Sequence, residues 1–345
     1  MAYNLKDVLN KDSRFVSGHR MCAGCGAPPA VRMVLRALNE NDNAVVSCAT
    51  GCLEVSSFLY PYTSWKNVSF IHTAFECASA TLSGVERAYN KLKRDGKINK
   101  DNVTKFLAFG GDGGTLDIGF QSLSGAMERN HDITYICYDN GAYMNTGTQR
   151  SSSTPHFADT TTSPAGKVLN GKNVPRKDLT TIMAAHNLPY VAQSALFLNM
   201  KDIYEKAKKA IYTEGPTFIS VFSPCPRGWG YPTEDLQKIE KLALDTCFWP
   251  VYEIENGVYK INYKPSNKLP IEEFLKTQKR FKHLFAPGNE YLISTLQEEI
   301  DKKWEYLLNM EKFTNKENII RKYNITTIDK PSIEDIMLLY VKGEK

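Results

Sequence analysis

Two apolar runs, each followed by polar side chains, constrain the fold of this chain more than any other feature. They are separated by about the length of one β-α-β unit. The first run, 106–109, ends in a glycine-rich turn that contains Asp112. The second run, 133–138, ends in Asp139 and Asn140. A β-α-β unit takes about 30 residues or more, so two parallel strands would present Asp112 and Asn140 at one carboxyl edge of a sheet. Open α/β sheets bind ligands at that edge.

The residue types at this edge indicate a diphosphate held through a magnesium ion. Glycines allow the backbone to approach a phosphate closely, and one carboxylate with one amide oxygen suits Mg²⁺ that completes its shell with phosphate oxygens. A plain β-α turn is the simpler alternative. A dinucleotide fingerprint would need a third glycine, and a Walker A loop would need Gly-Lys-Ser/Thr after the turn. The sequence has neither.

Strand-like and helix-like segments alternate along the first two thirds of the chain. This alternation predicts an α/β fold with a mainly parallel sheet and helices on both faces. The strand-like runs are 44–47, 69–73, 105–109, 133–138, 190–193 and 217–222. The helix-like segments are 28–38, 75–94, 119–129, 179–185 and 200–212.

Two domains of unequal size are expected: an α/β domain over residues 1–232 and a charged, helical extension over 233–345. In the first, residues 146–178 are rich in Thr, Ser, Gly and Pro, and a loop of that length inside a domain is usually functional. In the extension, 271–281 and 290–310 have an amphipathic pattern, so we expect it to pack on the domain or on a partner. The polar tail after 313 is expected to reach another subunit.

Charge and composition exclude several classes of protein. The net charge of +5 on 345 residues is mild, and no basic stripe is interleaved with aromatic residues, so nucleic acid is not an expected partner. No apolar run reaches membrane length, and the first residues lack the apolar core of a signal peptide. We therefore expect a cytoplasmic protein without membrane contact, whose eight cysteines are free thiols or metal ligands.

Four of the cysteines lie at predicted turns and are flanked by glycine or proline: Cys22, Cys25, Cys52 and Cys225. Four thiolates are enough for one [4Fe–4S] cluster. A structural zinc site is the chemical competitor, although the second C-x2-C of a zinc ribbon is missing. A redox C-x-x-C pair is the other alternative. The remaining cysteines are expected to be small core residues: Cys48, Cys77, Cys137 and Cys247.

Taken together, the glycine-rich turn and the cysteines resemble the thiamine-diphosphate-binding β subunits of 2-oxoacid:ferredoxin oxidoreductases, most of all the pyruvate-type members. The matching stretches lie in the family's order at 18–26, 50–52, 110–114, 143–147, 149–152, 154–155, 224–226 and 228–229. The segment 270–310 is also similar to the pyruvate-type subunit. The resemblance implies oxidative decarboxylation of pyruvate to acetyl-CoA and CO₂, reversible, with electrons passed through the cluster to ferredoxin.

The resemblance also implies roles for individual residues. Asp112, Asn140 and the Ala142 carbonyl would hold Mg²⁺ and the diphosphate. Asn145 would be the catalytic residue, as a donor to the substrate carbonyl. The other residues implied at the coenzyme are Thr50, Gly51 and Cys52 between coenzyme and cluster, Gly111, Gly113 and Gly114 at the phosphate, and Tyr143 and Met144 at the thiazolium.

Ylid formation also needs a glutamate against the aminopyrimidine ring. Glu54 and Glu76 are local candidates, but a helix-start or surface role suits them better, and the resemblance puts this glutamate on an α-type partner subunit. A ferredoxin-like subunit or domain would relay the electrons. Three alternatives stay open: another acid such as oxalate, 2-oxoglutarate or a branched-chain oxoacid; a non-redox thiamine-dependent decarboxylase or synthase subunit; and a zinc-stabilised binding subunit.

Overall fold

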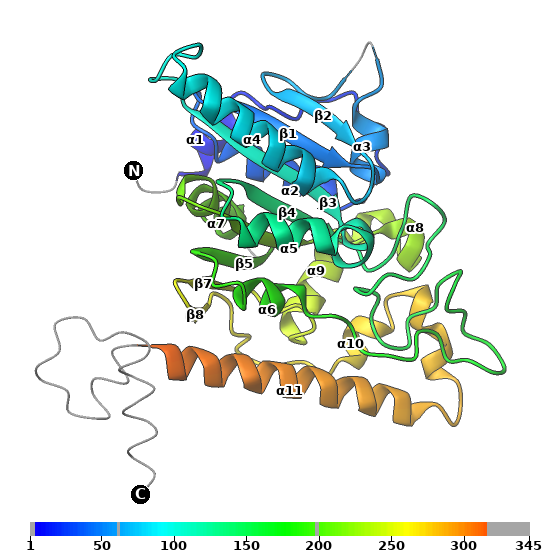
Figure 1. Cartoon of the computed structure of the whole chain (residues 1–345). Helices are drawn as coiled ribbons and strands as arrows, with labels where there is room; N and C mark the ends of the chain where they lie inside the picture. The colour runs from blue at the N-terminus through cyan, green and yellow to red at the C-terminus, as the bar shows by residue number, and fades with distance from the viewer. Residues whose placement is uncertain (1–3, 61–62, 197–199, 316–345) are drawn as a thin grey trace, which may run out of the picture.

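A computed structural model describes residues 4–60, 63–196 and 200–315, and its centre is an eight-stranded sheet with the order β2-β1-β3-β4-β6-β5-β7-β8 (Figure 1). The first six strands pair in parallel. They are β1 (Asn43–Ala49), β2 (Ser69–Thr73), β3 (Thr104–Gly111), β4 (Thr134–Asp139), β5 (Tyr190–Ala195) and β6 (Thr217–Phe222). Each coincides with a predicted strand-like run, and the predicted α/β class with a mainly parallel sheet is confirmed.

Helices cover both faces of the sheet. In Figure 1, α4 (Ala78–Arg94), α5 (Phe120–Glu128) and α6 (Leu179–Ala184) lie in front, and α2 (Ala27–Arg36) and α7 (Met200–Tyr212) lie behind. Successive side chains of a strand point to opposite faces. Accordingly Leu107 packs in the core with α2 and α7, whereas its neighbour Ala108 packs in the core with α4 and α5. Burial on both faces explains why the strands read as continuous apolar runs.

The region after Pro232 contains more strand than the sequence led us to expect. It begins with η2 (Thr233–Asp235) and α9 (Leu236–Asp245), then forms the hairpin β7 (Tyr252–Glu255) and β8 (Val258–Ile261). This hairpin joins the main sheet, because β7 pairs antiparallel with β5. The C-terminal extension is helical as predicted, and this hairpin is an addition that the sequence analysis did not predict.

The rest of the extension is helical. It comprises α10 (Glu272–Leu275), the 3₁₀ segment η3 (Lys279–Phe285) and the long helix α11 (Glu290–Thr314), which packs against β8 at the edge of the sheet (Figure 1). The remaining short helices are α1 (Leu5–Asn10), α3 (Cys52–Ser57), η1 (Gly114–Ile118) and α8 (Pro226–Trp229). None of the helices in the described ranges is long and apolar enough to cross a membrane. Most of the predicted tail, from residue 316 on, lies outside the described residues.

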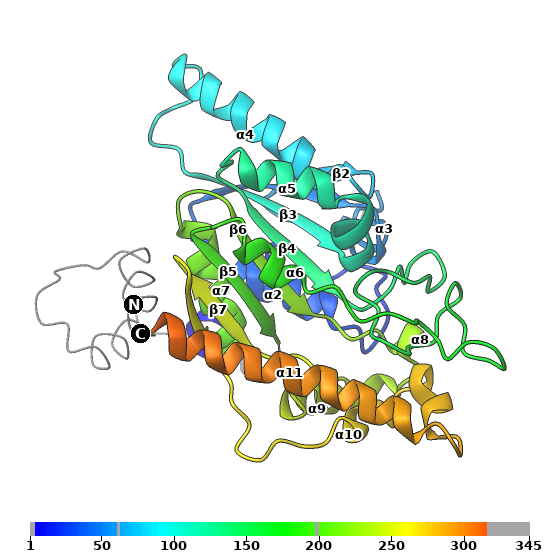
Figure 2. The same ribbon diagram turned by 60° about the horizontal axis from the view of Figure 1, so that its bottom comes forward.

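The long segment between β4 and α6 is a loop, as predicted, and one buried lysine ties it together. Lys172 is 1% exposed, and its ammonium group donates to the carbonyl oxygens of Thr154 at 2.6 Å, Ser152 at 2.9 Å and Pro175 at 3.2 Å. Burial lowers the pKa of Lys172 to about 8, and the nearby cations Arg150 and Arg176 contribute. These three bonds fix both arms of the loop beside the carboxyl edge of β4 (Figure 2).

Candidate coenzyme and metal site

Asp112 and Asn140 meet at the carboxyl edge of β3 and β4, as the spacing of their strands predicts. Gly111 at the end of β3 pairs with Tyr138 of β4. This register puts the residues that follow each strand side by side, and the backbone N–H of Asn140 donates to Asp112 Oδ1 at 3.2 Å. The structure therefore brings together the two side chains on which the predicted site depends.

One cleft at this edge gathers all of the predicted coenzyme residues. Its lining includes Thr50, Gly51, Cys52, Gly111, Asp112, Gly113, Gly114, Asn140, Ala142, Tyr143, Met144 and Asn145. Three further residues of the lining were missed by the sequence analysis: Phe75, Tyr138 and Thr146. Tyr138 could have been found, because it ends the run that delivers Asn140. Nothing in the sequence marks the other two.

Three oxygen atoms can converge at the deep end of this cleft. The side-chain amide of Asn140 lies 2.9 Å from Asp112 Oδ1 and 2.8 Å from the carbonyl oxygen of Ala142. With its nitrogen toward them, the amide donates a hydrogen bond to both. With its oxygen toward them, three oxygens face one another, an arrangement that a cation must separate. A carboxylate, an amide oxygen and a backbone carbonyl are ligands that Mg²⁺ accepts, so this set of donors fits the predicted ion.

The folded chain alone stabilises the ionised carboxylate of Asp112 poorly. Its side chain is 1% exposed, and its Oδ2 accepts a hydrogen bond of 2.5 Å from the Ser151 hydroxyl. Burial raises the pKa of Asp112 well above its usual range, and the neighbouring charge of Asp139 raises it further. Arg176, a cation whose charge acts on Asp112, is already engaged, because its Nη2 donates to Asp139 Oδ2 at 2.5 Å. A divalent ion at the oxygen set would supply the missing positive charge.

Gly113 lies at the start of the helical turn that continues into η1, where backbone N–H groups are free to bind phosphate. The Tyr143 hydroxyl donates to the Gly113 carbonyl oxygen at 2.8 Å, and its ring covers the turn. A Cβ at Gly113 would lie 2.5 Å from Tyr143 Cζ, closer than real Cβ contacts. A residue with a side chain could therefore not occupy this position without displacing Tyr143.

Two loops carry three of the four predicted cluster cysteines and are bonded to each other. The backbone N–H of Gly26 donates to the Pro224 carbonyl oxygen at 3.0 Å, and the Tyr231 hydroxyl donates to the Gly24 carbonyl oxygen at 3.0 Å. These bonds hold the Cys22–Cys25 turn against the Cys225 turn, which caps α8.

The four thiols are close enough to affect one another. Burial is the main cause that raises the pKa of Cys25 to about 12, and the neighbouring Cys225, Cys52 and Cys22 raise it as well. Cys52 behaves in the same way, and it also interacts with Asp112. Cys52 therefore links the group of thiols to the cleft.

The number and type of these thiols suit a cluster, whereas their arrangement does not form a site for a single metal ion. Over the ranges 4–60, 63–196 and 200–315, no group of three or more His, Cys, Asp or Glu side chains is placed so that it could hold a metal ion. Of the other cysteines, Cys48, Cys137 and Cys247 are buried and Cys77 is half-buried. Cys48 packs in the core beside α2, away from solvent.

Neither candidate glutamate lines the cleft. Glu54 is fully buried in α3, where its carboxylate pairs with His72 Nδ1. Glu76 lies just before α4 and is half-buried. Both residues lie at or near the start of a helix, as expected, but a surface role for Glu54 was wrong because its side chain is fully buried.

The comparisons with known proteins agree with this geometry. The family described as "Thiamine pyrophosphate enzyme, C-terminal TPP binding domain" matches residues 49–221. The chain is 48% identical over 320 residues to pyruvate synthase subunit PorB of Thermotoga maritima, with 91% of this chain and 98% of that protein covered. It is 52% identical to PorB of Methanocaldococcus jannaschii, with 86% and 97% covered.

The chain belongs to the family of pyruvate synthase PorB subunits. A solved structure of 2-oxoglutarate:ferredoxin oxidoreductase from Magnetococcus marinus is similar as well, with a TM-score of 0.51 and 25% identity over 62% of this chain and 67% of that one. The resemblance stated from the sequence is thereby confirmed, and so is a thiamine-diphosphate-binding domain. PorB proteins are subunits, which makes this chain a component of a larger complex.

Proposed function

We propose that this chain is the thiamine-diphosphate-binding subunit of a pyruvate:ferredoxin oxidoreductase. The complex converts pyruvate and coenzyme A to acetyl-CoA and CO₂ and passes two electrons to ferredoxin, and the reaction is reversible. The observation that carries the proposal is the single cleft lined by all twelve residues that the sequence assigns to the coenzyme. The PorB relatives, which cover nearly the whole chain, support the choice of pyruvate.

Different residues of the cleft bind the metal ion, the diphosphate and the substrate. Asp112, Asn140 and the Ala142 carbonyl hold Mg²⁺, and the turn at Gly113 binds the diphosphate through backbone N–H groups. When bound, thiamine diphosphate supplies the nucleophilic carbon and the electron sink for decarboxylation. Asn145 lies at the exposed mouth of the cleft. From there its amide donates to the carbonyl oxygen of the substrate and orients it.

The four cysteines are proposed to ligate one [4Fe–4S] cluster. Cluster binding requires the thiols to lose their protons, and the raised pKa values of Cys25 and Cys52 describe the chain without metal. Gly24, with φ of +73°, gives the Cys22–Cys25 turn a conformation that favours glycine. Cys52 lies in both the thiol group and the cleft lining, so a cluster held by these thiols would adjoin the coenzyme site.

The partner subunits supply what this chain lacks. An α-type subunit contributes the glutamate for the aminopyrimidine ring, because Glu54 is paired with His72 and Glu76 lies outside the lining. A ferredoxin-like subunit or domain carries the electrons onward to ferredoxin. The chain by itself is therefore expected to be inactive.

Anaerobic purification of the complex from its source, followed by an assay of ferredoxin reduction, tests the proposal. A panel of pyruvate, 2-oxoglutarate, oxalate and a branched-chain 2-oxoacid should give the highest kcat/KM for pyruvate, and activity should require coenzyme A. A preference for another acid would correct the substrate and leave the chemistry in place. Decarboxylation without ferredoxin reduction would refute the redox function.

A further inference from the structure

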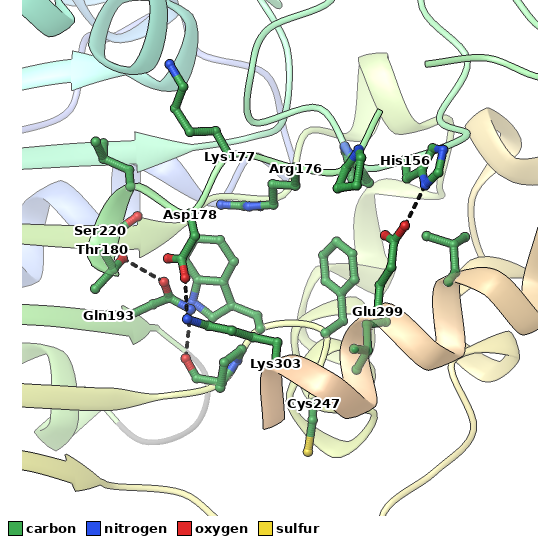
Figure 3. A pocket seen from close by; sticks show the side chains of 18 residues that line it. His156, Arg176, Lys177, Asp178, Thr180, Gln193, Ser220, Cys247, Glu299 and Lys303 are labelled. Atoms are coloured by element: carbon green, nitrogen blue, oxygen red, sulfur yellow. Dashed lines mark hydrogen bonds and ion pairs between the residues drawn. The ribbon is translucent and has the colours of Figure 1, made fainter. Parts of the chain in front are cut away.

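A second cavity lies away from the coenzyme cleft and shares no lining residue with it (Figure 3). Its volume is about 200 Å³, and its walls come from the long loop, the start of α6, the segment 247–250 and one face of α11. None of the predicted cofactor, cluster or substrate residues reaches it. The proposed function therefore leaves this cavity without a use.

The walls of the cavity are largely apolar. Phe248 and Trp249 line one side, and Leu179, Leu296 and Ile300 line others. An engineered apolar cavity of about 150 Å³ in another protein is large enough to bind benzene. The present cavity is larger, so a six-membered ring with a small substituent fits its volume.

Most of the charged groups around the cavity are already paired. His156 Nδ1 and Glu299 Oε1 lie 2.7 Å apart, and Lys303 pairs with Asp178 (Figure 3). Lys177 points away from the cavity, and its ammonium group donates to the Leu116 carbonyl oxygen at 2.6 Å. Because these groups are engaged with one another or with the backbone, they are poor candidates to bind a ligand.

Arg176 differs from them. Within the described part of the chain its guanidinium donates to one acceptor, Asp139 Oδ2, and it lies 4.6 Å from the centre of the Trp249 ring. A guanidinium has five N–H donors arranged as a fork, so the edge that Asp139 does not occupy remains available. Its side chain is 25% exposed and lines the cavity. A cation with open donors at an apolar cavity is suited to one end of an amphipathic anion.

We propose that this cavity binds a small carboxylate with an apolar body, about the size of benzoate. The carboxylate accepts paired hydrogen bonds from the open edge of Arg176, and the apolar body packs against Trp249, Leu296 and Ile300. Nucleotides are too large for the volume. The inference does not rest on thiamine diphosphate or on the cluster, because neither site contributes to the cavity.

Calorimetric titration of the full-length chain with benzoate and benzamide tests the proposal without any substitution. The two probes have the same ring and nearly the same size, but only benzoate is charged at neutral pH. Charge-assisted hydrogen bonds are roughly twice as strong as neutral ones. We expect saturable benzoate binding with a Kd of about 1 mM or below and benzamide binding at least about tenfold weaker. Equal affinities, or no saturable benzoate binding, would overturn the proposal.

Two variants locate the site. Ile300→Phe fills the cavity from α11, and Arg176→Lys keeps a cation near Asp139 but removes the fork. Each should weaken benzoate binding about tenfold or more, whereas Arg94→Lys on the exposed face of α4 should not. Circular dichroism checks that each variant is folded. Unchanged benzoate affinity in a folded Ile300→Phe variant would place the binding elsewhere and contradict the assignment.

Discussion

Asp112→Asn should separate coenzyme binding from folding, because the Asp112 carboxylate serves a cation more than it serves the fold. The side chain is 1% exposed, and burial and the charge of Asp139 raise its pKa. Breaking a compensated buried ion pair commonly costs about 3–5 kcal/mol. Asp112 is not compensated in that way, and the asparagine oxygen can still accept from Ser151. We therefore expect the free energy of unfolding without coenzyme to stay within about 1 kcal/mol of the parent or to rise.

Coenzyme binding should change far more. A ligand present at 100 times its Kd stabilises the folded chain by about 2.7 kcal/mol. If loss of the metal ligand weakens binding about 100-fold, the same concentration stabilises the variant by only about 0.4 kcal/mol. Urea unfolding of both chains, with and without Mg²⁺ and thiamine diphosphate, measures this difference of more than about 2 kcal/mol.

Asp132→Asn is a matched control for Asp112→Asn. Asp132 also accepts a backbone hydrogen bond, from Gly215 at 3.1 Å, but it lies at the opposite end of β4. Asp132→Asn should keep the full stabilisation by coenzyme. If Asp112→Asn lost about 3 kcal/mol or more without ligand and kept its response to coenzyme, Asp112 would be structural and the assigned site would be wrong.

Three further predictions test other parts of the structure. Replacing Cys225 with serine should lower the iron content of the anaerobically purified complex, whereas Cys77→Ser should not; equal iron in both would refute the ligand. Asn145→Ala should lower kcat at least about tenfold with normal coenzyme content, as a lost donor to the substrate predicts. Glu253 should stabilise the chain by about 3 kcal/mol above pH 4.5. That contribution should fade as the pH falls toward 2, and acid unfolding of Glu253→Gln should lack this dependence.

The direction of the pH dependence predicted for Glu253 follows from the groups that surround its carboxylate. Burial alone would raise its pKa, but hydrogen bonds from Tyr190, Asn262 and Lys260 and the charge of Lys209 outweigh burial and lower the pKa to about 2. A lowered carboxyl pKa stabilises the folded state above the usual pKa of 4.5. Glu253 lies on β7, so this acid-sensitive interaction holds the C-terminal hairpin to the sheet.

Much of the fold and the centre of the site could be predicted because they depend on local pattern. Buried parallel strands appear as continuous apolar runs, and the register of β3 and β4 then fixes Asp112 beside Asn140. The hairpin after Pro232 was missed although a signal was present. Asn256 and Gly257, with φ of 50° and 79°, form the turn that Asn-Gly favours between two alternating strands. The charged residues around this turn were interpreted as a helical surface.

Other features could not be predicted, because they arise only when distant segments meet. Ser151, which donates to Asp112, reaches it from the long loop, 39 residues away. Arg176 reaches Asp139 from the same loop, and the second cavity needs α11 to close it. No periodicity or motif encodes these contacts. They depend on how Lys172 folds the loop over the edge of the sheet.

The ratio of reduced ferredoxin to released CO₂ tests the central claim most directly. The purified complex, supplied with pyruvate, coenzyme A, Mg²⁺ and thiamine diphosphate, should reduce about two one-electron ferredoxins for each CO₂. The complex reconstituted with the Asp112→Asn chain should show neither product above background. Release of CO₂ from pyruvate without ferredoxin reduction, or full activity of the Asp112→Asn complex, would contradict the account.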